Sequence, residues 1–144
     1  MKKGMALVLA MIMVLSAANA LAANFYLIPD SDTRQLTEEE LWYWQYDALG
    51  YVLNEIFARH GYHFDPDGKY YAYFNEQDWY EESTRFSSNE KVLDQMSQIE
   101  WANEELVKHV REEMRKQDTL NPNGLPVPDV FDKPEVPAAY PNYR

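Results

Sequence analysis

The stretch that decides the fold of this 144-residue chain is NEIFARHGYHF, residues 54–64. Its first half continues an apolar helical pattern. Gly61 then supplies the residue that most often follows the last turn of a helix, in the left-handed conformation. In that arrangement Phe57 and Tyr62 occupy two positions whose side chains commonly touch. The stretch therefore predicts a helix that stops at a defined residue.

The start of the same helix is predicted at Thr37. Thr37 and Glu40 have the spacing of a capping box, in which each side chain accepts a hydrogen bond from the other residue's backbone N–H. Apolar residues then recur at helical spacing up to the stop. Gly50 lies inside this pattern, where glycine costs about 1 kcal/mol relative to alanine. We predict one long helix over residues 37–60.

Two more helices are predicted after the stop. The turn residues 65–68 precede a short helix over residues 69–76, which should bury Tyr70, Tyr73 and Phe74. Downstream, Ser87 and Glu90 form a second capping box, and the helix they open is predicted to reach residue 117. Its apolar stripe consists of Val92, Met96, Ile99, Asn103, Leu106, Val110 and Met114.

Asn103 is the polar member of that stripe. A buried amide needs hydrogen-bond partners, because leaving it unsatisfied costs about 1–3 kcal/mol. The three predicted helices together make a small all-α domain over residues 37–117, in the order long, short, long. Its aromatic residues should supply the dense core that so small a domain needs.

The regions outside this domain have different compositions. Residues 1–22 have the lysines, the apolar run and the small-x-small sites of a secretory signal peptide. The apolar run is shorter than the ~20 residues that span a bilayer, so we expect cleavage and a secreted or periplasmic product. Residues 23–36 form a short N-terminal segment. Residues 118–144 hold six of the eight prolines and are predicted to be a disordered, extended tail.

The composition excludes several classes of protein. The chain has 24 acidic and 13 basic residues and a formal net charge of -11. Binding to nucleic acid is not expected, because no basic excess exists to neutralise phosphates. The absence of cysteine excludes disulfides, a thiol nucleophile and the cysteine of a bacterial lipid anchor. No cofactor and no integral membrane span after cleavage are expected.

Several motifs together resemble the YARHG domain, a presumed extracytoplasmic bacterial domain. The motifs are Asn54–Phe64, Tyr73–Phe74, Trp79–Tyr80, Ile99–Glu100 and Asn103. The resemblance implies a secreted or membrane-attached bacterial protein and brings no established activity with it. Within the first motif a phenylalanine stands where the family name begins with a tyrosine, so any role of that hydroxyl is absent here.

A small group of polar residues in the first motif could carry catalysis. A histidine near a carboxylate is the minimum for general acid–base chemistry, and Glu55 lies close to His60. Glu55 and Arg59 are also four residues apart, which makes an ordinary helix ion pair. We expect Arg59 to pair with Glu100 or Glu55, and His60 to bond Asn103 or a backbone carbonyl. The motif residues, predicted to be structural first and functional second, are Glu55, Arg59, His60, Gly61, Glu100 and Asn103.

A metal site is not expected. An EF-hand loop begun at His63 would place Asp65 and Asp67 correctly, but it would put Phe74 where a bidentate glutamate belongs.

Aromatic residues crowd the start of the first predicted helix, where a single helical stripe cannot bury them all. An exposed aromatic platform suits polysaccharide, peptidoglycan or a protein partner. The favoured function is therefore a non-enzymatic binding or cell-envelope interaction module. The alternative is a small hydrolase-like or enzyme-accessory domain that uses Arg59, His60 and Glu55. The candidate binding aromatics are Trp42, Tyr43, Trp44, Tyr46, Trp79 and Tyr80.

Overall fold

The computed structural model describes residues 26–126. The predicted signal peptide and residues 127–144 of the predicted tail lie outside this range. Over residues 26–126 every regular element is a helix, which confirms the all-α fold class. No helix in that range is both long and apolar enough to cross a membrane. The helices are α1 (Glu38–Leu41), α2 (Tyr46–Ala58), α3 (Lys69–Phe74), α4 (Asn89–Leu93) and α5 (Gln98–Lys116).

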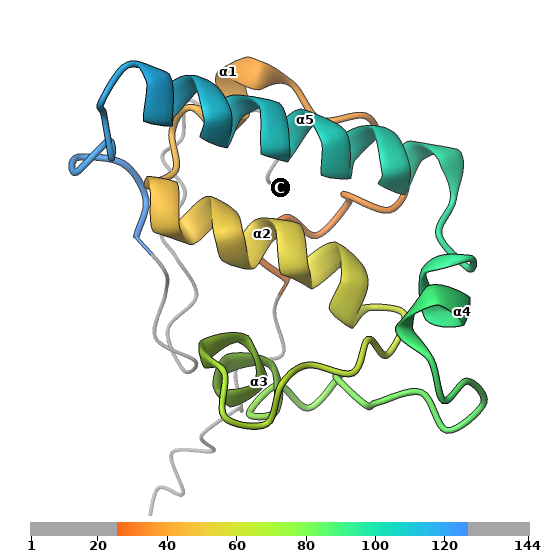
Figure 1. The fold of residues 1–144 in the computed structure, drawn as a ribbon. Coiled ribbons are helices and arrows are strands. Elements are labelled where there is room, and N and C mark those ends of the chain that lie inside the picture. Colours follow the sequence, from red (N-terminus) through yellow and green to blue (C-terminus); the bar gives the residue numbers. More distant parts are fainter. Residues whose placement is uncertain (1–25, 127–144) are drawn as a thin grey trace, which may run out of the picture.

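Helix α2 lies at the centre of the fold. Helix α5 packs along one side of it and α3 along the other, while α1 packs against α5 (Figure 1). Between α2 and α5 the buried residues Leu49 and Val52 face Val107 and Val110, none of them more than 1% exposed. Burying such side chains contributes about 1.5–3 kcal/mol each, so this seam stabilises the fold by several kcal/mol.

Aromatic rings fill the space between α2 and α3. Phe64 and Phe74 stack with ring centroids 5.3 Å apart and planes 16° apart. Tyr73 meets Tyr51 edge-on at 5.0 Å. The predicted burial of Tyr73 and Phe74 is confirmed, but Tyr70 is only half-buried.

The first predicted helix is in fact two helices. The capping box of Thr37 and Glu40 is present and opens α1. However, α1 ends at Leu41 and α2 begins only at Tyr46, so the prediction of one continuous helix is wrong. Local spacing was correct for each piece and could not show the interruption between them.

The interruption is made by residues 119–126, part of the predicted disordered tail. Leu125 N–H donates to the Tyr43 carbonyl at 2.7 Å, and Gln45 N–H donates to the Leu125 carbonyl at 2.9 Å. Backbone groups that would continue a helix are thereby paired with a distant segment. The tail prediction is therefore wrong up to residue 126, since these residues belong to the folded unit.

The N-terminal segment also belongs to the folded unit. Leu27 and Ile28 are 1% and 0% exposed and join the core. The predicted start of the domain at residue 37 is thus too late. Sequence patterns could not predict this packing, because two apolar residues before a proline are too short a pattern to predict an element.

The last predicted helix is also divided. Helix α4 begins after Ser88, not Ser87, and α5 begins after Ser97. Ser97 and Glu100 form a complete capping box, with bonds of 3.2 and 2.8 Å. This competing box starts a new helix and changes which residues face inward.

The change of phase alters the predicted apolar stripe. Ile99 is 38% exposed, whereas Val107, which the stripe omitted, is fully buried. Asn103, Val110 and Met114 lie on the buried face as predicted.

Candidate functional site

The stop at the end of α2 has the predicted geometry. Gly61 is left-handed, with φ of +77°. Its N–H donates to the Ala58 carbonyl at 2.9 Å, and Tyr62 N–H donates to the Phe57 carbonyl at 3.3 Å. The rings of Phe57 and Tyr62 lie 5.5 Å apart. This is a complete Schellman motif, and every bond in it comes from neighbouring residues.

Gly61 also allows a loop to dock closely. A Cβ atom at this position would lie 2.7 Å from the Glu81 carbonyl oxygen and 2.7 Å from the Ser83 nitrogen. Ser83 N–H donates to the Gly61 carbonyl at 2.9 Å. Both the conformation and the contact therefore require glycine.

Glu55 binds the backbone of the N-terminal segment. One carboxylate oxygen accepts from Leu27 N–H at 2.6 Å and the other from Ile28 N–H at 3.1 Å. Glu55 is 1% exposed, and this burial raises its pKa to about 7, although both hydrogen bonds and Arg59 act in the opposite direction. The carboxyl group therefore faces the protein interior and holds residues 27–28 there.

Arg59 lies along the same segment. Its Nη2 donates to the carbonyl oxygens of residues 28 and 29, each at 3.0 Å. The guanidinium stands 3.7 Å over the Tyr26 ring, and Nη2 is 3.7 Å from Glu55 Oε1. The expected ion pair with Glu55 is thus present, and the alternative pair with Glu100 is not.

His60 connects the end of α2 to the start of α5. His60 Nε2 lies 2.7 Å from Glu100 Oε1, while the other Glu100 oxygen accepts from Ser97 N–H at 2.8 Å. The expectation that His60 bonds Asn103 or a backbone carbonyl is wrong. Glu100 lies one turn closer to His60, and the amide of Asn103 is already satisfied elsewhere.

Asn103 uses its whole amide on the N-terminal segment. Its Oδ1 accepts from Leu36 N–H at 2.8 Å, and its Nδ2 donates to the carbonyls of Ser31 and Arg34 at 2.7 and 2.8 Å. The side chain is 0% exposed. The buried amide of Asn103 is therefore satisfied by backbone groups of residues 31–36. Spacing along the sequence could not predict that this distant segment approaches α5.

Glu55, Arg59 and Asn103 together form what we call the N-terminal clamp, because all three bind the backbone of residues 27–36. The Glu55 carboxylate, the Arg59 Nη2 group and the Asn103 amide each bond to this backbone, while Arg59 Nε is buried with no hydrogen-bond partner in the described range. The arrangement supports the structural role expected for the motif, and it gives no support to the hydrolase-like alternative. General acid–base chemistry needs such groups to meet a substrate, whereas these meet the chain itself.

The predicted binding aromatics fall into different environments. Trp44 is 0% exposed, so it is a core residue and not part of a binding surface. Tyr46 is half-buried beneath the Arg111 guanidinium, 4.5 Å from its ring centroid. Trp79 and Tyr80 are half-buried at the α3 end, with rings 6.4 Å apart.

Trp42 and Tyr43 remain at the surface. Trp42 is half-buried and Tyr43 is 42% exposed. Two adjoining shallow recesses share the Trp42 side chain, and we call them the Trp42 recesses. The larger, of about 600 Å³, is lined by Glu38, Trp42, His109, Glu113 and Gln117. The smaller, of about 320 Å³, is lined by Glu39, Trp42 and Tyr43.

The larger recess surrounds an indole with polar groups from two helices. Glu38 Oε1 lies 3.7 Å from His109 Nε2, and Glu113 bonds Lys116 Nζ at 2.9 Å. The α5 residues of this site were not predicted from the sequence. A signal existed, since residues 109, 113 and 117 recur every four positions on a helix, but nothing in the sequence paired that row with Trp42.

These features define a small all-α domain with an internal backbone clamp and a polar, aromatic surface site. The family model of the YARHG domain matches residues 24–110, and the chain belongs to this family. YARHG is a domain of extracytoplasmic proteins. The match includes the N-terminal segment, in agreement with its place in the core. No curated protein and no solved structure matches the chain.

Proposed function

We propose that this protein is a non-enzymatic binding module of the bacterial cell envelope and that the Trp42 recesses are its ligand contact. The observation that carries the proposal is the position of Trp42, which lines both recesses and is still half-exposed. Large aromatic side chains in concave, partly polar sites dominate many binding energies.

The backbone around Trp42 is fixed before any ligand arrives. Trp42 N–H donates to the Glu38 carbonyl at 2.9 Å. The Asn121 amide donates to the carbonyls of Trp42 and Trp44 at 2.7 and 3.0 Å. A preorganised aromatic loses little conformational freedom on binding, which favours affinity.

The chemistry of the larger recess suits a carbohydrate. An indole offers an apolar face to the C–H groups of a sugar ring, and carboxylates, an amide and an imidazole can bond its hydroxyls. Glu38, His109 and Gln117 provide these groups around Trp42. The favoured ligand is therefore the glycan of an envelope polymer such as peptidoglycan.

The proposed location is the periplasm or the exterior. Residues 1–22 have the pattern of a cleavable leader, and the family consists of domains of extracytoplasmic proteins. A module exported in this way would meet envelope polymers directly.

The test is co-sedimentation of the chain from residue 23 onward with purified, insoluble peptidoglycan. We expect the wild-type chain to pellet and Trp42→Ala to weaken binding about tenfold, the effect of losing ~1.4 kcal/mol. Trp101→Ala is the matched control, because Trp101 is 40% exposed on α5 and does not line either recess. Equal loss in both variants, or no pelleting of the wild type, would sink the proposal.

A further inference from the structure

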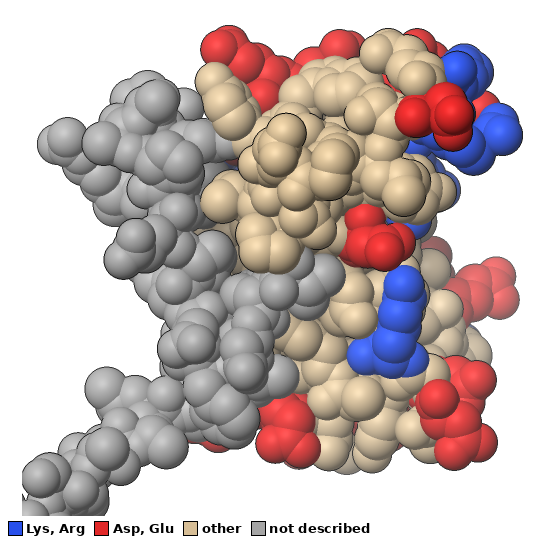
Figure 2. Space-filling view, turned by 90° about the vertical axis from the view of Figure 1, so that its left-hand side faces the viewer, with Lys and Arg blue, Asp and Glu red and all other residues tan. Residues whose placement is uncertain are grey.

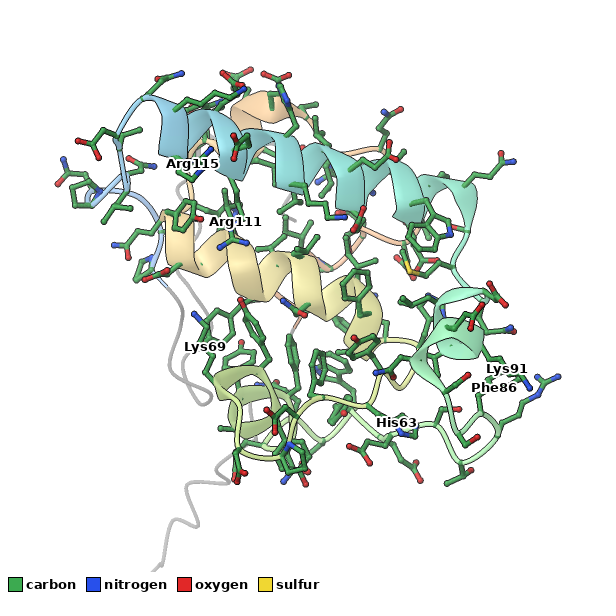
Figure 3. The ribbon with its side chains drawn as sticks, in the orientation of Figure 1. His63, Lys69, Phe86, Lys91, Arg111 and Arg115 are labelled. Carbon is green, nitrogen blue, oxygen red and sulfur yellow. The ribbon has the colours of Figure 1, made fainter. Side chains whose placement is uncertain are left out.

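A second surface combines cations with tyrosines. Arg115, Arg111 and Lys69 lie one below another from α5 across the first turns of α2 to α3 (Figure 3). Arg115 is occupied by a bidentate bond to Glu112, at 2.9 and 2.6 Å. On the side where α5 ends and α2 begins, basic groups lie toward one edge of the surface, with acidic groups beside and between them (Figure 2). The residues that we call the basic–tyrosine strip are Tyr46, Tyr51, Lys69, Tyr70 and Arg111.

Arg111 is held in place without an acceptor. Its guanidinium stacks over Tyr46 at 4.5 Å. Its Nε is buried and has no hydrogen-bond partner in the described part of the chain, where no carboxylate forms a salt bridge with Arg111 either. An arginine offers five donors, so a fixed arginine without an acceptor is suited to receive one from outside.

Gly50 lets a tyrosine hydroxyl approach the same point. A Cβ atom on Gly50 would lie 2.6 Å from the Tyr70 hydroxyl and 3.6 Å from Arg111 Nη2. The missing side chain therefore allows a hydroxyl from α3 and a guanidinium from α5 to converge above α2. This accounts for a glycine in the middle of a helix, where it is otherwise unfavourable.

Lys69 adds a second positive charge. Its Nζ lies 5.2 Å from the Tyr70 ring centroid and 5.7 Å from that of Tyr51. Burial raises the pKa of Tyr51, with smaller contributions from Tyr70 and from Asp47, the acid that acts on this tyrosine. Asp47 forms a salt bridge with neither Lys69 nor Arg111 within the described range, so both cations stay available.

We propose that Arg111, Lys69 and the Tyr70 hydroxyl bind an oxyanion, either a carboxylate or a phosphate. A guanidinium fork binds two oxygens of such a group, an ammonium adds a point charge and a phenol adds one donor. The tyrosine rings would contact the apolar part of the molecule that carries the anion. This site is separate from the Trp42 recesses and does not rest on the proposed function.

The test is calorimetric titration of the chain from residue 23 onward at low salt, with inorganic phosphate and with trigalacturonic acid, a short carboxylated glycan. We expect at least one probe to bind and Arg111→Gln and Lys69→Gln each to weaken it about tenfold or more. Lys91→Gln removes the same charge from α4, on the far side of the molecule (Figure 3), and should leave binding unchanged.

The outcomes separate the possible sources of the anion. Binding of trigalacturonic acid alone identifies a carboxylated polymer, and binding of phosphate identifies a phosphate group. Lys69 is exposed, so Lys69→Gln keeps the fold even if Arg111→Gln does not. Absence of binding by both probes, or equal weakening by Lys91→Gln and Lys69→Gln, would overturn the proposal. Trp42→Ala should retain this binding, which distinguishes it from the proposed peptidoglycan contact.

Discussion

The two ends of α2 are built in opposite ways. At the C-terminal end, Gly61 and its immediate neighbours make every bond of the helix stop. At the N-terminal end, residues 120 and 125 pair with the backbone of residues 43–46 and separate α1 from α2. One end is specified within a single turn of chain, and the other depends on a segment that lies beyond α5.

This difference teaches where sequence patterns are sufficient. A glycine stop works through contacts between residues a few positions apart, so its residues are visible together. A helix start made by a distant segment has no local signature. The same contrast separates the buried N-terminal clamp, which uses motif residues, from the Trp42 recesses, which combine residues of α1 and α5.

Breaking the local end should have the largest effect. Gly61→Val should lower the free energy of unfolding by about 4 kcal/mol, because valine resists φ of +77° and its Cβ would lie 2.7 Å from the Glu81 carbonyl. Urea unfolding measures this loss. Gly68→Ala is the control, since the backbone at Gly68 has φ of -89° and should cost at most about 1 kcal/mol. Similar losses of unfolding free energy in both variants would show that the left-handed conformation and close contact at Gly61 do not contribute to stability.

The next largest effect should come from breaking the N-terminal clamp, which holds residues 27–36 against α2 and α5. Asn103→Leu should cost about 3 kcal/mol, because it leaves Leu36 N–H and the carbonyls of Ser31 and Arg34 unpaired inside the protein. Hydrogen exchange of the Leu36 amide should accelerate in Asn103→Leu, and an unchanged rate would contradict the clamp.

The clamp should also make stability depend on pH. An unfolded Glu55 carboxyl ionises near pH 4.5, while in the fold its pKa is about 7. Between these values the folded chain retains a proton that the unfolded chain has released, so Glu55 should lower stability by about 3 kcal/mol as pH rises through this window. The free energy of unfolding of Glu55→Gln, measured by urea unfolding over the same pH range, should lack the decline that the wild type shows. If the stability of the wild type shows no decline between pH 4.5 and 7 and follows that of Glu55→Gln, the predicted effect of Glu55 is refuted.

Breaking the distant end of α2 should have the smallest effect. A chain ending at Asp118 loses the bonds that Leu120 and Leu125 make to residues 43–46 and should be less stable by about 2 kcal/mol. A chain ending at Pro126 keeps these bonds and is the control. Equal thermal midpoints for the two truncated chains would mean that the α1–α2 interruption does not need residues 119–126.

The aromatic residues show how much of the candidate site was predictable. The crowding of residues 42–46 correctly indicated that not all could be buried. Spacing could not tell that Trp44 enters the core and Trp42 lines a recess, because it predicts a continuous helix through both residues. The break between α1 and α2 turns these side chains away from the directions that a continuous helix would give them. The break depends on hydrogen bonds from residues 119–126, which the spacing of residues 42–46 cannot predict.

The sequence by itself determined the all-α class, the capping box at Thr37 and the stop at Gly61, because these features arise from bonds between residues three to five positions apart. Only the tertiary structure decided where the long helices divide and what Asn103 and Glu55 bind. Those outcomes depend on backbone groups of remote segments, whose approach is fixed by burial of Leu27, Ile28 and Trp44 in a shared core.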